Sequence, residues 1–265
     1  FVSAAGDIEV LANAKEEFIS VAAGVGGSGT VGIGVAASVI ILDNTTYAYI
    51  GDDATAYQSN VGLGHATAGA IATAGGSVII KASDDTEVTM IAGSLGVGLG
   101  AAGIGGAASI LLITKDTQAF AGDNSEIDGK GNGSTHANIY DGSIVTNGSN
   151  EFSAFGTETS GGSDERTSEG EVLFRGVAIQ ASSKEDFFII GASAGGGLYA
   201  GLAGGVTVET IDSDTTAFAG ERSRINSDNS SGGVNSEQSI NISAVNNVEI
   251  WTLAGAIAIG AGGLA

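Results

Sequence analysis

The sequence contains no cysteine and no proline, and it has few basic residues. Without cysteine, a disulfide framework, a thiolate metal site and cysteine catalysis are excluded. Without proline, collagen and proline-rich linkers are excluded. Nine Lys and Arg against 30 Asp and Glu give a net charge of −21, which repels phosphate backbones, so no nucleic-acid partner is expected. The 43% share of hydrophobic residues is in turn too high for a wholly disordered chain.

Aromatic residues are also scarce, at 6% of the 265 residues, whereas glycine contributes 45. Small side chains bury little area each, so stability must come from backbone hydrogen bonds and closely spaced layers. In segment 31–36, valine or isoleucine alternates with glycine or alanine. This period of two predicts strands with aliphatic side chains on one face and small residues on the other. A glycine face allows a second layer to approach closely.

Four segments share a pattern, and they predict repeat units starting near residues 8, 78, 177 and 240. In each unit the fifth residue is alanine and the tenth is acidic; the acids are Glu17, Glu87, Asp186 and Glu249. A second signature, TYAYIG, TQAFAG or TTAFAG, follows in the first three units. It aligns Tyr49, Phe120 and Phe218, which we interpret as one structural position that fills a corner of each unit.

The spacing of the units predicts a stack of coils. A unit would hold roughly three coils of about twenty residues, or two larger ones. The aligned acids would then be more than one coil apart, unable to share an ion, and would mark turns before buried strands. Likewise Thr46, Thr117 and Thr215 would be too far apart to form the dense array of an ice-binding solenoid.

Uncharged runs cover residues 18–42, 88–114 and 187–208, and each is long enough to span a bilayer as a helix. Glycine and alanine dominate these runs, however, and acids rather than Lys or Arg flank the first and the third. Strands are therefore favoured over transmembrane helices, and no membrane span is expected.

The longest polar segment, residues 123–176, predicts an insertion with extra strands in GSIVTN and VLFRG. Tyr140, Phe152 and Phe155 are its candidate ligand-binding residues, because function concentrates on loops held by a rigid scaffold. Asp123, Glu126 and Asp128 are candidate Ca²⁺ ligands on a glycine-rich turn. Their spacing matches neither the EF-hand loop nor the G-G-x-G-x-D repeat, and a solvated acidic turn is the alternative.

Catalysis finds little support in the sequence. His65 and His136 lie in unrelated contexts, and without Cys or a G-x-S-x-G motif no nucleophile–base pair emerges. The acids are scattered, so no carboxylate pair for glycoside cleavage is identified. We expect neither an enzyme nor a bound cofactor.

The V-x-I-x-A starts, the E-x-F-I-x-V-A-A-G and V-T-M-I-A-G runs and the D-T-x-A-F-A-G motif together resemble the repeats of bacterial filamentous surface adhesins. These are two-partner-secretion exoproteins of the filamentous haemagglutinin-like and leukotoxin-like kind. The resemblance covers most of the chain outside residues 123–176. It implies an elongated right-handed parallel β-helix, or β-solenoid, with irregular loop insertions, exported through an outer-membrane partner.

The resemblance implies a structural segment of a giant extracellular adhesin, a rigid stalk and display scaffold for attachment at the bacterial cell surface. Expected partners are neighbouring repeats of a longer parent chain, a host or neighbour-cell glycan or protein, and further copies in filaments. The chain opens in repeat material and stops part-way through a fourth unit, as a piece of a longer protein would. The alternatives are a ligand-binding module that uses the 123–176 insertion and a carbohydrate-active β-helix enzyme.

Overall fold

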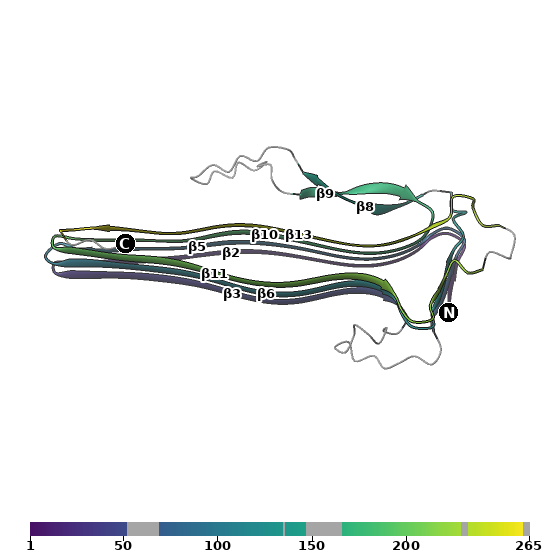
Figure 1. Ribbon diagram of the computed structural model, residues 1–265, viewed down its shortest axis with the longest axis horizontal. Helices are drawn as coiled ribbons and strands as arrows, with labels where there is room; N and C mark the ends of the chain where they lie inside the picture. Colours follow the sequence, from purple (N-terminus) through teal and green to yellow (C-terminus); the bar gives the residue numbers. More distant parts are fainter. Residues whose placement is uncertain (52–68, 135, 147–165, 229–232, 262–265) are drawn as a thin grey trace.

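The computed structural model describes residues 1–51, 69–134, 136–146, 166–228 and 233–261. The regular secondary structure in this part of the chain consists of strands alone. The strands wind into a parallel β-solenoid, in which two long sheets face each other and a short third sheet closes one end (Figure 1). The prediction of an all-β solenoid with loop insertions is confirmed.

Each complete coil contains one short strand followed by two long strands. The first coil consists of β1 (Val2–Ala4), β2 (Ile8–Ser28) and β3 (Val31–Ile50), and the second of β4 (Ile71–Ala74), β5 (Val78–Gly98) and β6 (Ala102–Ala121). The third consists of β7 (Glu126–Gly129), β10 (Gly176–Gly197) and β11 (Ala200–Ala219), with β8 (Ala137–Thr146) and β9 (Arg166–Phe174) inserted after β7. The fourth begins with β12 (Arg224–Ile225) and β13 (Ser239–Ile259).

Successive coils pair in parallel and in register. The short strands form sheet A in the order β1-β4-β7-β12, the first long strands form sheet B in the order β2-β5-β10-β13, and the second long strands form sheet C in the order β3-β6-β11. In sheet B, Ile8, Val78, Val177 and Ile240 occupy one row of Cα partners. The four predicted repeat starts therefore mark four coils, one coil per unit.

The expectation of about three coils per unit is wrong, because the long strands run for 20 to 22 residues without a corner. No proline or Asn-Gly pair interrupts them. Their inward side chains are also small over much of this length, so the two sheets lie on each other without bending around a wide core.

The interior changes in character along the long strands. We call the end closed by sheet A the base, and the end where β2 turns into β3 the tip (Figure 1). From base to tip the inward residues form an aliphatic cluster, a polar belt, a second apolar cluster around Met90 and Phe187, and finally serines and glycines.

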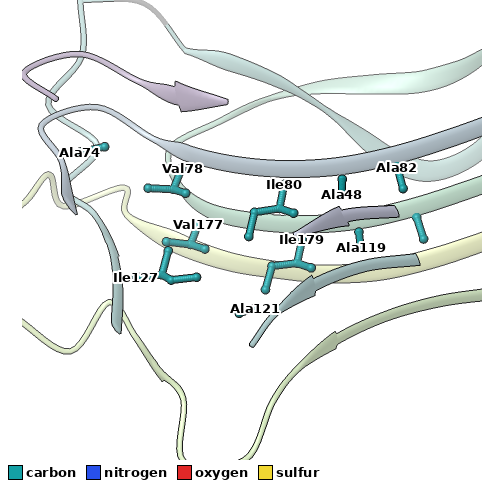
Figure 2. Packing of buried hydrophobic residues seen from close by; sticks show 11 residues of the cluster. Ala48, Ala74, Val78, Ile80, Ala82, Ala119, Ala121, Ile127, Val177 and Ile179 are labelled. Atoms are coloured by element: carbon teal, nitrogen blue, oxygen red, sulfur yellow. The ribbon is translucent and has the colours of Figure 1, made fainter. Parts of the chain in front are cut away.

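At the base, side chains from all three sheets meet in one core (Figure 2). Ile80 and Ile179 of sheet B point toward Ile127 of sheet A and toward the alanines of sheet C, including Ala119. All of these side chains are buried. Large residues on one wall thus pack against small residues on the other, which fills the space between the sheets.

At the tip, backbone packs directly on backbone. A Cβ atom added to Gly24 would lie 2.0 Å from the Val35 carbonyl oxygen, and one added to Gly105 would lie 2.2 Å from the Ala194 carbonyl oxygen. Neither position has room for a side chain, because real Cβ atoms do not approach this closely. The predicted glycine face is confirmed, and it points into the solenoid.

The aliphatic partners of these glycines point outward. Val25, Ile33 and Val35 are 81%, 58% and 66% exposed. The tip therefore has apolar outer faces and a glycine-lined interior, which is the reverse of an ordinary hydrophobic core.

The inserted strands β8 and β9 pair as an antiparallel hairpin that packs on the outer face of sheet B near the base. Ala137, Ile139 and Phe174 of the hairpin form a small buried cluster with Ile79 and Ala178 of the sheet. The predicted extra strands in the insertion are thus present, while its first part, Glu126–Gly129, is strand β7 of the coil itself.

The three uncharged runs form strand–turn–strand segments at the tip. None of the described residues belongs to a helix that is long and apolar enough to cross a membrane.

Candidate functional site

The polar belt is the most unusual part of the interior, because charged side chains lie between two sheets. We define it by its inward-facing residues Glu16, Asn44, Thr46, Asp84, Thr86, Lys115, Ser183, Glu185 and Ser213. Asp84 and Lys115 project from β5 and β6 of the second coil, and Glu185 projects from β10 of the third. The side chains of all three are 0–1% exposed.

Lys115 is the centre of the belt. Its Nζ atom contacts Asp84 Oδ1 directly and lies 3.1 Å from Glu185 Oε1. It also donates a hydrogen bond to Thr86 Oγ1 at 2.8 Å. A buried ammonium group needs such partners, because its transfer from water without them costs several kcal/mol.

The two carboxylates beside Lys115 are held by further donors. Asp84 Oδ2 accepts hydrogen bonds from Asn44 Nδ2 at 2.6 Å and from Thr46 Oγ1 at 3.0 Å. Glu185 Oε1 accepts hydrogen bonds from the Ser183 and Ser213 hydroxyls at 2.5 and 2.8 Å. The second oxygen, Glu185 Oε2, is buried and has no hydrogen-bond partner among the described residues.

The belt contains more acid than base. With Glu16 it holds three carboxyl groups around one lysine. Burial raises the pKa of Glu16 above its ordinary value, and the charge of Asp84 raises it further. A proton is therefore retained in the belt more readily than on a free glutamate.

A second acidic group lines a depression on the outer face of sheet C. Asp43, Asp116, Asp212 and Asp214 line it together with Tyr47, whose hydroxyl donates a hydrogen bond to Asp116. Burial and the neighbouring Asp116 raise the pKa of Tyr47. Within the described residues, no three acidic, His or Cys side chains are arranged to hold a metal ion.

The candidate Ca²⁺ ligands bind protein atoms of the next coil. Asp123 Oδ1 accepts a hydrogen bond from the Glu221 backbone N–H at 2.8 Å, and Asp128 Oδ1 accepts one from the Asp228 N–H at 3.2 Å. Glu126 forms an ion pair with Arg224. These three acids therefore connect the third coil to the fourth, Asp123 at the corner between sheets C and A and the other two within β7 of sheet A, and the Ca²⁺ site itself stays a prediction.

Among the candidate ligand-binding aromatics, the structure describes Tyr140 alone. The Gln180 side chain accepts a hydrogen bond from the Tyr140 N–H and donates one to its carbonyl oxygen, at 2.8 and 2.7 Å. The Lys81 Nζ atom lies 3.2 Å from the centre of the Tyr140 ring. Tyr140 thus attaches the hairpin to sheet B, whereas Phe152 and Phe155 lie outside the described residues.

His65 also lies outside the described residues, and His136 belongs to a contact at the base of the hairpin. Its Nε2 atom accepts a hydrogen bond from Arg175 Nε at 3.1 Å, and Arg175 also donates to the carbonyl oxygens of Gly131 and Gly133. This histidine orients a structural arginine.

The aligned acids and threonines lie closer together than the sequence suggested. Glu17, Glu87, Asp186 and Glu249 form one row of Cα partners on the outer face of sheet B, within strands rather than at turns. Thr46, Thr117 and Thr215 form another row, which faces the interior of the solenoid. Both expectations of wide separation are wrong, because one unit is one coil and equivalent residues are adjacent.

The aromatic position Tyr49, Phe120 and Phe218 is confirmed as one structural row. Its rings stack with centroids 4.8 and 5.0 Å apart and nearly parallel planes. Lys115, in contrast, was not singled out from the sequence. One signal was available in the strand over residues 102–121. Lys115 lies two and four positions before the inward-facing Thr117 and Ala119, and residues at this spacing share one face of a strand.

Comparisons with known proteins give no further guide: no family model matches the chain, and neither a curated protein nor a solved structure is significantly similar to it.

Proposed function

We propose that the chain is a structural segment of a bacterial cell-surface filament, a stiff spacer that displays the β8–β9 hairpin. The in-register stacking of coils is the observation that supports this function. Each coil pairs its strands only with those of its neighbours, so the architecture gains length by the addition of coils. The surface location and the role in attachment rest on the resemblance of the repeat motifs to those of filamentous adhesins.

The net charge of −21 would keep separate filaments apart at low salt.

Antibodies raised against the purified chain test the surface location. Applied to intact and to lysed producing cells, they should label both equally. Labelling that appears only after lysis would contradict a surface filament.

A second candidate function is ligand binding by the insertion, which is favoured by the attachment of the hairpin to sheet B through Gln180 and Tyr140. Tyr140 and Glu171 are cross-strand partners, so an Asn-Gly turn can replace residues 141–170 without disturbing that attachment. Loss of cell attachment in this variant, with the filament still on the surface, would indicate that the insertion binds the ligand. Unchanged attachment would restrict the segment to the spacer function.

A further inference from the structure

The polar belt brings the two reactants of an amide bond into contact in a dry interior. The Lys115 amine touches the Asp84 carboxyl group, and both side chains are 0–1% exposed. They belong to facing strands, β6 in sheet C and β5 in sheet B. Groups held in contact react as if at concentrations of about 10⁵–10⁸ M, so water does not compete effectively.

We propose that Lys115 and Asp84 condense into an isopeptide bond that joins sheet B to sheet C inside the second coil. This covalent cross-link is independent of the spacer function proposed above. The bond replaces two buried charges with a neutral amide, which removes the cost of keeping both charges away from water.

The reaction balances without a co-reactant. The neutral Lys115 Nζ attacks Asp84 Cγ and forms the C–N bond, while the bond from Cγ to Oδ1 breaks. The ammonium group loses two protons in total, and both leave with Oδ1 as one water molecule. The amide keeps the third proton, so an ammonium and a carboxylate become an amide and water with no change in total charge.

Glu185 is the catalytic residue, which transfers these protons as a general base and then as a general acid. Its Oε1 atom lies 3.1 Å from Lys115 Nζ, and its Oε2 atom is buried without a hydrogen-bond partner among the described residues. A carboxylate in this position accepts a proton from the attacking amine and passes it to the departing oxygen. It is regenerated when water leaves.

Asn44 and Thr46 stabilise the other oxygen of Asp84. Both donate hydrogen bonds to Oδ2, the oxygen that becomes negatively charged when the amine adds to Cγ. Two fixed donors at this atom act as an oxyanion hole, which lowers the barrier because the charge is stabilised without reorganisation of solvent. The belt thus holds a nucleophile, an electrophile, a proton carrier and oxyanion donors.

A neighbouring pair provides a matched control. Lys184 and Asp85 lie on the outer face of sheet B, 3.8 Å apart, with side chains 13% and 37% exposed. This pair lies outside the buried network of Asn44, Thr46 and Glu185, so it is expected to stay an ion pair.

Mass spectrometry of the purified wild-type protein under denaturing conditions tests the proposal. The intact mass should be lower than the sequence mass by one water molecule. Tandem spectra of a proteolytic digest should contain a branched peptide that links Asp84 to Lys115. The branched peptide is required, because an Asp-Gly pair such as Asp128-Gly129 also loses one water when it forms a succinimide.

Three variants show whether these side chains take part in forming the bond or only stabilise the fold. Glu185→Gln keeps the shape of the side chain but cannot carry the proton, so the bond should form about 10²–10⁴-fold more slowly. Lys115→Met should abolish the bond, and Lys184→Met should leave it unchanged. The full sequence mass in the wild type, or a loss of water without the Asp84–Lys115 peptide, would overturn the proposal.

Discussion

The base and the tip are built from the same strands, yet they are stabilised in opposite ways. At the base, Ile80 and Ile179 fill the space between the sheets, and the stability comes from buried apolar area. At the tip, inward glycines such as Gly105 let the backbones touch, and valines and isoleucines face solvent. A coil of this β-solenoid therefore needs a side-chain core only where its two walls are far apart.

The largest change in stability is expected when a side chain is added at the tip. Gly105→Val should lower the free energy of unfolding by more than about 3 kcal/mol, because its Cβ would overlap the Ala194 backbone. Denaturant unfolding followed by circular dichroism measures the change. Gly106→Val adds the same atoms to the next residue, where a Cβ meets nothing within 4 Å, and should raise stability by up to about 1 kcal/mol. Equal losses in the two variants would contradict the backbone-packed tip.

The second test removes a side chain at the base. Ile80→Ala should cost about 2–3 kcal/mol, because it leaves a cavity among the strands of sheets A, B and C. The matched variant Ile41→Ala removes the same atoms from a side chain that is 76% exposed, and should change stability by less than about 0.5 kcal/mol. Similar values for the two in chemical denaturation would show that the base has no side-chain core.

The third test concerns the aromatic row at the base end of sheet C. Phe120→Leu should cost about 1 kcal/mol beyond its change in area, because Phe120 stacks on both Tyr49 and Phe218. Tyr49→Phe keeps the stacked ring and should have no measurable effect on the melting temperature. A comparable loss in Tyr49→Phe would mean that the hydroxyl group, and not the ring stack, stabilises this row.

The smallest effect is expected in the polar belt between the two regions, and it depends on pH. Burial raises the pKa of Glu16 in the folded protein whether Asp84 is ionised or part of an amide, so the protonated form of Glu16 favours folding. This contribution is present below the ordinary pKa of 4.5 and is lost as pH rises through the raised value. Glu16→Gln, which is neutral throughout, should therefore raise the melting temperature near neutral pH and have no effect below pH 4.5.

The control for this prediction is Glu9→Gln, which removes the same charge from an exposed position on the same strand. It should leave the pH profile of Glu16 unchanged. A stabilisation that persists unchanged at acidic pH in Glu16→Gln would contradict a raised pKa.

The sequence predicted the elements of the fold well. The period of two in segment 31–36 predicted strands, and the aligned starts at Ile8 and Val78 became a row of the ladder. It did not predict the length of the coil, because alternation looks the same in one strand of twenty residues and in several short ones. A coil has corners where turn residues or a wide core require them, and the long strands contain no proline or Asn-Gly pair and have small inward side chains over much of their length.

The candidate site was predictable only in part. Asp84 and Lys115 lie 31 positions apart in the chain, and nothing in either segment indicates that they meet. They meet because β6 folds back on β5, so residues that are equally far from the turn between the two strands lie opposite each other. Along both strands, from the tip toward the base, the residues that face the interior are first glycines, then serines, then large aliphatic residues, and finally the residues of the belt.

The all-β class, the repeat starts and the glycine face follow from the amino-acid sequence, because alternation and composition act locally on the backbone. Three features follow only from the folded chain: each unit is one coil, Glu17 and Glu87 are neighbours, and Lys115 is buried against Asp84 and Glu185. These contacts depend on where the chain turns back on itself. That point is set by the packing of whole sheets, whose energy belongs to no single segment of the chain.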